Sequence, residues 1–144
     1  FVFRTVVAGE SFDAALKHPE FYKVAAAGAP VTDWREYDTA YSERYMGAPG
    51  PNQATYDDQS LFTAAKKTQT PRPILLIHGT ADDNVYFMHS LKMTDALFRA
   101  GKKYDFLVLP GFTHMVPDPV VTRSLYTRVA DFFVRELQPG PSAR

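Results

Sequence analysis

The hydrophobic pattern in the second half of the chain alternates between short apolar runs and helical repeats. Four consecutive apolar residues, Ile74 to Ile77, lie between Pro73 and Gly79, and residues 104–109 form a second apolar run. Such runs are typical of strands buried on both faces of a parallel sheet. Between the two runs, apolar positions repeat at helical spacing and end at Gly101, which predicts a helix crossing one sheet face. These positions are Met93, Ala96, Leu97 and Ala100.

A long amphipathic helix is predicted after a loop at residues 110–117. Asp118 is suited to cap this helix and Pro119 to begin it. Its apolar face consists of Val121, Leu125, Val129, Phe132 and Phe133. Residues 139–144 are predicted to be a frayed tail. The alternation of strand and helix implies an α/β fold, with a mostly parallel sheet covered by helices on both faces.

The first half of the chain has weaker periodicity. Residues 2–7 are β-prone and predict a strand, residues 8–13 are turn-like, and residues 13–17 are sufficient for only a short helix. Residues 21–31 combine apolar and small side chains, which favours a central strand over a helix.

An aromatic stripe distinguishes residues 32–46, which are predicted to form one helix that is capped by Thr32 and ends at Gly47. Its members recur every three or four residues and are Trp34, Tyr37, Tyr41 and Tyr45. Two interpretations are open: packing of the stripe on the sheet, which is favoured because apolar stripes are usually core, and a lining for a substrate pocket. Residues 47–52 are predicted to be a loop and residues 61–67 a short helix.

Composition narrows the choice of partners. The chain has 144 residues with 16 basic and 16 acidic side chains, which argues against nucleic acid or an anionic membrane as the main partner. The absence of cysteine excludes a thiol nucleophile and cysteine-ligated metals. No apolar run approaches the roughly 20 residues that cross a bilayer. One domain over residues 1–144 is expected, and the start at Phe1 suggests a piece of a longer protein; the pattern does not indicate a compartment.

Candidate chemistry lies at two predicted strand ends. Asp82 and Asp83 follow one strand, and His114 follows the next. Because parallel strands present their carboxyl ends at the same edge, a carboxylate and the imidazole are expected within hydrogen-bond reach. That is the acid–base half of a Ser-His-Asp triad.

Several motifs occur together in a recognisable order. They are Lys17-His18-Pro19, Ala29-Pro30-Val31-Thr32-Asp33-Trp34, Tyr41-Ser42-Glu43-Arg44-Tyr45-Met46-Gly47, His78-Gly79-Thr80-Ala81-Asp82-Asp83-Asn84-Val85, and Pro110-Gly111 with His114. From Lys17 to Leu137 the chain resembles the catalytic domain of prolyl-oligopeptidase-like serine peptidases, most closely the dipeptidyl-peptidase IV branch. The resemblance implies the C-terminal part of an α/β-hydrolase domain, in which residues 1–16 are atypical.

The resemblance also implies roles for individual residues. Asp82 would be the triad acid and His114 the base, while Asp83 and Asn84 would hold the turn through their side chains. The alternatives are a turn carboxylate for Asp82 and a solvent-contacting loop residue for His114. No cofactor is expected.

Other histidines are assigned structural roles. His18 is expected to be exposed, and His78 is expected to hydrogen-bond backbone. A metal site formed by His78, Asp82, Asp83 and His89 can be written down, but no compact ligand motif supports it.

The nucleophile is the weakest part of the pattern. The family places it in a Gly-x-Ser-x-Gly elbow between a strand and a helix. Here Gly9-Glu10-Ser11-Phe12 comes nearest, with Asp13 in place of the second glycine. Ser11 is therefore the candidate nucleophile, and its alternative role is a helix N-cap.

Two function classes follow. One is a serine peptidase that hydrolyses peptide bonds through an acyl-enzyme, with an esterase as a variant of the same chemistry. The other is a non-catalytic remnant or binding module with the same fold. The expected partners are a peptide substrate and a second copy of the chain, because a truncated sheet exposes an edge.

Overall fold

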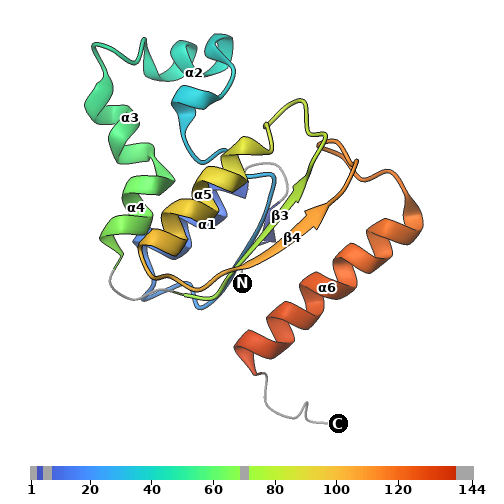
Figure 1. Ribbon diagram of the computed structural model, residues 1–144. Helices are drawn as coiled ribbons and strands as arrows, with labels where there is room; N and C mark the ends of the chain where they lie inside the picture. The colour runs from blue at the N-terminus through green and yellow to red at the C-terminus, as the bar shows by residue number, and fades with distance from the viewer. Residues whose placement is uncertain (1–2, 5–7, 69–71, 139–144) are drawn as a thin grey trace.

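The computed structural model describes residues 3–4, 8–68 and 72–138, and its centre is a parallel sheet of four strands (Figure 1). The strands lie side by side in chain order. They are β1 (Phe3–Arg4), β2 (Ala25–Gly28), β3 (Ile74–Gly79) and β4 (Asp105–Leu109). Every strand is parallel to its neighbour, so the carboxyl ends of β3 and β4 meet at one edge.

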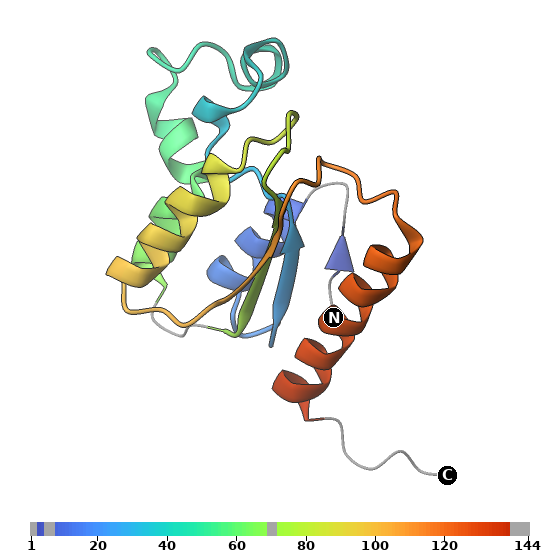
Figure 2. The same cartoon turned by 45° about the vertical axis from the view of Figure 1, so that its right-hand side comes forward.

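Helices cover both faces of this sheet. The helices of the described chain are α1 (Ala8–Lys17), the short 3₁₀ helix η1 (Trp34–Glu36), α2 (Thr39–Met46), α3 (Gln53–Gln59), α4 (Leu61–Lys67), α5 (Met88–Arg99) and α6 (Pro119–Leu137). Figure 2 shows α6 alone on one side, with α1, α4 and α5 on the other. None of the helices in the described ranges is long and apolar enough to cross a membrane.

Two hydrophobic clusters hold the layers together. Ile74 and Leu76 of β3 face the cluster formed with α1, α4 and α5. Leu75 and Ile77 face the opposite cluster, which includes Phe132 of α6. Alternate residues of β3 thus fill different cores, as expected of a strand buried on both faces. The predicted α/β fold, with helices on both faces of a parallel sheet, is confirmed.

The N-terminal helix is longer than the sequence predicts. Residues 8–13 were expected to form a turn, yet α1 begins at Ala8. Phe12, Ala15 and Leu16 are buried at helical spacing, so packing against the sheet outweighs the turn-forming residues. The predicted strand at residues 2–7 is a strand at Phe3–Arg4; the rest of that segment, and the predicted tail at 139–144, lie outside the described residues.

The single helix predicted at residues 32–46 is wrong. The segment divides into η1 and α2, whose caps are the carboxylates of Asp33 and Asp38. Thr32 does not cap, because its hydroxyl is paired with His89. The strand predicted at residues 21–31 is confined to β2.

The remaining predicted boundaries agree closely with the structure. The loop at residues 47–52 and the helix at 61–67 occur as expected. Asp118 caps α6 by accepting from the backbone N–H groups of Val120 and Val121. Gly101 follows α5 with a φ of 66°, a left-handed conformation that glycine adopts at little cost.

Candidate active site

The loop after β4 is docked directly against the end of β3. Ala81 N–H donates to the Phe112 carbonyl at 3.0 Å, and Thr80 N–H donates to the Leu109 carbonyl at 3.1 Å. A Cβ on Gly79 would lie 2.2 Å from the Phe112 carbonyl oxygen, so only glycine permits this approach. The loop that carries His114 is therefore fixed relative to the turn that carries Asp82.

Asp82 and His114 meet at this edge. The Asp82 side chain is fully buried, and its Oδ2 lies 2.9 Å from Nδ1 of His114. Oδ1 accepts from the backbone N–H groups of Asn84 at 3.0 Å and Val85 at 2.9 Å. A carboxylate oxygen accepts, so Nδ1 of His114 carries the proton of this bond, and Nε2 has no hydrogen bond among the described residues. The predicted contact between the two strand ends is confirmed.

His78 is a third member of this cluster. Its Nε2 donates to the Val85 carbonyl at 2.8 Å, as the expected backbone bond requires. The same nitrogen lies 3.2 Å from Oδ2 of Asp82, a contact the sequence did not predict. Burial lowers the pKa of His78 below its ordinary value, with the Val85 carbonyl and the Asp82 carboxylate opposing. The ring is therefore neutral near pH 7.

The turn is held differently from the sequence-based expectation. Asp83 and Asn84 were expected to hydrogen-bond the turn backbone, but the carboxylate of Asp82 itself makes both bonds. Asp83 is exposed, and its side chain makes no hydrogen bond within the described residues. Asn84 instead accepts a hydrogen bond from the hydroxyl of Tyr37 at 2.9 Å.

The aromatic residues of η1 and α2 pack on one another, so the favoured interpretation of a sheet-packing stripe is wrong. Trp34 and Tyr41 stack at a centroid distance of 5.8 Å, and Tyr45 lies 5.0 Å from Tyr41. Tyr41 and Tyr45 are 50% and 70% exposed. Burial, with help from the Asp38 carboxylate, raises the pKa of Tyr37 and keeps its hydroxyl a donor.

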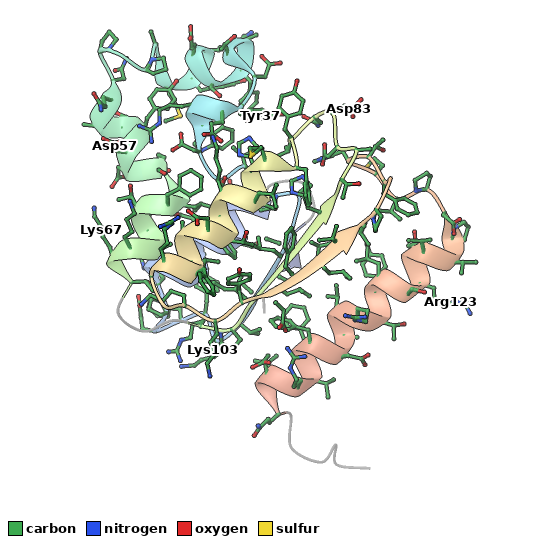
Figure 3. All side chains as sticks on the ribbon, in the orientation of Figure 1. Tyr37, Asp57, Lys67, Asp83, Lys103 and Arg123 are labelled. Carbon is green, nitrogen blue, oxygen red and sulfur yellow. The ribbon has the colours of Figure 1, made fainter. Side chains whose placement is uncertain are left out.

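This aromatic cluster, Trp34, Tyr37, Tyr41 and Tyr45, lies beside the Asp82 turn. The hydrogen bond from Tyr37 to Asn84 joins η1 to that turn across 47 positions of sequence. Figure 3 shows Tyr37 and Asp83 at the same end of the molecule, with Lys103 at the opposite end. A partly exposed aromatic surface and the hydrogen-bonded pair Asp82–His114 are therefore neighbours.

A second buried histidine holds η1 in place. Nδ1 of His89 lies 3.1 Å from the Thr32 hydroxyl, and its Nε2 lies 3.2 Å from the Glu36 carbonyl. Burial lowers the pKa of His89, so this ring is also neutral. His89 forms no ion pair within the described residues, and its role is to attach η1 to α5.

Ser11 is not joined to the pair. It lies inside α1, is 3% exposed, and its Oγ has no hydrogen-bond partner among the described residues. Its alternative role as an N-cap is wrong, since α1 starts three residues earlier. Residues 5–7, between β1 and α1, lie outside the described residues. The assignment of Ser11 as nucleophile stays a prediction, and its burial argues against it.

Groups of three or more histidine, aspartate or glutamate side chains able to hold a metal ion are absent from the described part of the chain.

Comparison with known proteins identifies the family of the chain. Residues 9–140 match the model of the prolyl oligopeptidase family. The chain belongs to that family. Dipeptidyl peptidase 8 of Homo sapiens is 42% identical over 110 residues, which cover 76% of this chain and 12% of that protein. A probable dipeptidyl-aminopeptidase B of Metarhizium robertsii is 41% identical over 114 residues, covering 78% and 12%.

Solved structures show the same fold. Dipeptidyl peptidase 4 of Porphyromonas gingivalis superposes with a TM-score of 0.84 at 29% identity, over 90% of this chain and 18% of that one. A putative dipeptidyl aminopeptidase IV of Bacteroides ovatus gives a TM-score of 0.83 with the same coverage. The chain thus spans only a small part of the length of these relatives.

Sequence reasoning found the pair but missed what surrounds it. The spacing of His78 and Asp82 at the end of an apolar strand was a usable signal for their contact. The bond between Tyr37 and Asn84 had no such signal, because it depends on where η1 folds.

Proposed function

We propose that this chain supplies the acid and the base of a serine peptidase centre of the prolyl oligopeptidase family. The observation that carries the proposal is the hydrogen bond between buried Asp82 and His114 at the carboxyl edge of the sheet. Its orientation leaves Nε2 of His114 available to a reacting hydroxyl, as general base catalysis requires. Membership of a peptidase family makes a peptide the favoured substrate.

The steps follow from the positions of the protons. Nε2 of His114 takes the proton of the nucleophilic hydroxyl as its oxygen bonds to the peptide carbonyl carbon. Asp82 stabilises the resulting imidazolium through Nδ1. When the carbon–nitrogen bond breaks, the imidazolium gives its proton to the leaving amine. Water then attacks the acyl ester with His114 again as base, which releases the acid and restores the hydroxyl.

The aromatic cluster favours a substrate that has an apolar side chain next to the cleaved peptide bond. Its rings offer partly exposed apolar surface next to Asn84, two residues from Asp82. Aromatic rings bind apolar and ring-shaped side chains through their faces. Two of the relatives are named as dipeptidyl peptidases, so amides with a dipeptide on the acyl side are the first substrates to try.

A second function is favoured by the burial of Ser11. If the hydroxyl cannot reach His114, the chain binds peptide at the aromatic cluster but forms no acyl-enzyme. The fold and the acid–base pair are retained in either case.

Labelling with a fluorophosphonate probe separates the two functions. Modification of Ser11 that is lost in Ser11→Ala and much reduced in His114→Gln supports the peptidase. A folded chain that remains unmodified, but binds a dipeptide amide, supports the binding module. Intact-mass and peptide mass spectrometry locate the adduct, and circular dichroism confirms that each variant is folded.

We also propose that the chain associates with itself. β1 is the last strand at one edge of the described sheet, and large apolar side chains are exposed on α5 and α6. These include Phe98 at 78%, Val120 at 75% and Val134 at 61% exposure. Sedimentation velocity tests this proposal, and a monodisperse monomer at all concentrations contradicts it.

A further inference from the structure

The imidazole of His78 is held from three sides. Its Nδ1 lies 2.7 Å from Oγ of Ser90, and its Nε2 lies 2.8 Å from the carbonyl of Val85. Phe87 meets the ring edge-on, with centroids 5.5 Å apart and planes at 83°. The side chain is 0% exposed, so the ring has one fixed orientation.

These partners also fix the tautomer. The Val85 carbonyl can only accept, so Nε2 of His78 must carry the ring proton. Nδ1 of the neutral ring is then an acceptor, and the Ser90 hydroxyl donates to it. Because burial lowers the pKa of His78, this arrangement persists through the neutral pH range.

The Nε2–H group of His78, which donates to the Val85 carbonyl, also lies within ion-pair distance of Asp82. Nε2 lies 3.2 Å from Oδ2 of Asp82, the same oxygen that accepts from His114. We propose that His78 is a positioning residue for the Asp82–His114 pair, with Ser90 holding it in the required tautomer. The inference rests on the proposed function only in treating that pair as the acid and base of catalysis.

The need for such a residue follows from the remaining bonds of Asp82. Both backbone donors, from Asn84 and Val85, reach Oδ1. Among the described residues, Oδ2 is approached only by His78 and by His114, whose side chain is 29% exposed and lies on a loop. When a carboxylate is hydrogen-bonded through one oxygen only, the position of the other oxygen is less restricted. The buried Nε2–H of His78 restricts Oδ2 to the side from which His114 approaches.

His89 provides a matched control. It is 1% exposed, as is His78, and its ring is likewise paired with a hydroxyl and a backbone carbonyl. It differs in having no carboxylate partner within ion-pair distance among the described residues. Replacing either histidine removes a buried ring of equal size, but only the replacement of His78 removes a ring N–H group that lies 3.2 Å from a carboxylate, that of Asp82.

The test observes the Asp82–His114 bond directly, without catalysis. The chain has four histidines, so ¹⁵N labelling of histidine gives few ring signals to assign. In the wild-type chain the Nδ1–H proton of His114 is expected far downfield and protected from exchange. His78→Phe should accelerate its exchange with water about tenfold, the effect of losing roughly one hydrogen bond. His89→Phe should leave it unchanged, and His78→Gln, which retains a donor, should restore part of the protection.

Each outcome of these exchange measurements either supports or overturns the positioning role of His78. Equal effects of His78→Phe and His89→Phe, or no effect of either, would show that His78 is only structural and overturn the inference. If His78→Phe does not fold, Ser90→Ala serves instead. It should alter the ¹⁵N shifts of His78 and weaken the His114 proton signal, and altered His78 shifts with an unmoved His114 signal overturn the inference equally. A wild-type chain without the His114 signal would instead contradict the pair itself, and with it the proposed function.

Discussion

The carboxyl end of β3 and the start of α1 differ in how their polar atoms are satisfied. At β3, both carboxylate oxygens of Asp82 and both ring nitrogens of His78 have partners. In α1, the buried hydroxyl of Ser11 has none within the described chain. Buried polar groups are normally paired, and catalytic groups are held by their neighbours. Asp82 and His114 are therefore held as one hydrogen-bonded unit, while Ser11 has the surroundings of a packing residue.

The largest expected effect on the β3 end comes from Gly79→Ala. The added Cβ would lie 2.2 Å from one backbone oxygen and 2.6 Å from another. The loop carrying His114 must then move away, which we expect to cost about 3 kcal/mol or more of unfolding free energy. The His114 Nδ1–H signal should be lost as well. Urea unfolding and NMR measure the two effects.

Gly28→Ala is the matched control, because Gly28 ends the neighbouring strand β2 and a Cβ there meets nothing within 4 Å. Its unfolding free energy should change by no more than about 0.5 kcal/mol. Similar losses in both variants would show that the docking of the loop on Gly79 is not what constrains the β3 end.

The next effect is expected from Asp82→Ala. Two backbone N–H groups and Nδ1–H of His114 would lose their shared acceptor, while His78 would keep its bond to the Val85 carbonyl. Buried donors left without partners should cost about 2 to 3 kcal/mol in total, since water can reach part of the site. Asp83→Ala changes the adjacent, exposed carboxylate and should be nearly neutral. Equal losses measured by urea unfolding would contradict the distinction between the two aspartates.

The local sequence pattern predicts those elements whose type is determined by a single local feature, such as an apolar run or a helix cap. The apolar run of β3 and the Asp118 cap of α6 need no knowledge of other segments. α3 was missed because its residues are almost all polar and only Tyr56 is buried. α1 was shortened in the prediction because Gly9 and Ser11 favour a turn locally, whereas burial of Phe12 decides for helix.

The candidate site likewise contains contacts that the sequence predicts and contacts that it does not. Asp82 and His114 were predictable because adjacent parallel strands bring their ends together. The spacing of His78 and Asp82 hints at their contact but does not decide it, because the contact also depends on the rotamer of a buried ring, which Ser90 of α5 fixes. The aromatic cluster depends on a break between η1 and α2 that helical spacing alone does not reveal.

The pH dependence of stability compares the two buried histidines. Burial lowers the pKa of both His78 and His89 below 6.5, so the unfolded chain binds their protons more readily. Stability is then fully present above the unfolded pKa and decreases as the pH falls below 6.5. Each histidine contributes a slope of at most about 1.4 kcal/mol per pH unit.

His78→Gln and His89→Gln should each remove one part of that slope in urea unfolding measured between about pH 5 and pH 7. The slopes lost need not be equal, because the carboxylate of Asp82 opposes the shift at His78. An unchanged slope in either variant would mean that the histidine binds protons equally in the folded and unfolded chains, so that its pKa is not lowered by folding.

The smallest effect is expected from Ser11→Ala. This substitution tests whether the buried hydroxyl in α1 lacks a partner, in contrast to the paired polar atoms at the end of β3. Removing a buried hydroxyl without a partner relieves a desolvation cost, and alanine is the better helix former. The unfolding free energy should therefore rise by up to about 1 kcal/mol. Ser90→Ala, which removes a buried hydroxyl bonded to His78, should lower it by about 1 kcal/mol. If urea unfolding shows that Ser11→Ala and Ser90→Ala lower the unfolding free energy by the same amount, the Ser11 hydroxyl does have a hydrogen-bond partner. The start of α1 would then have a polar site of its own, as a nucleophile requires.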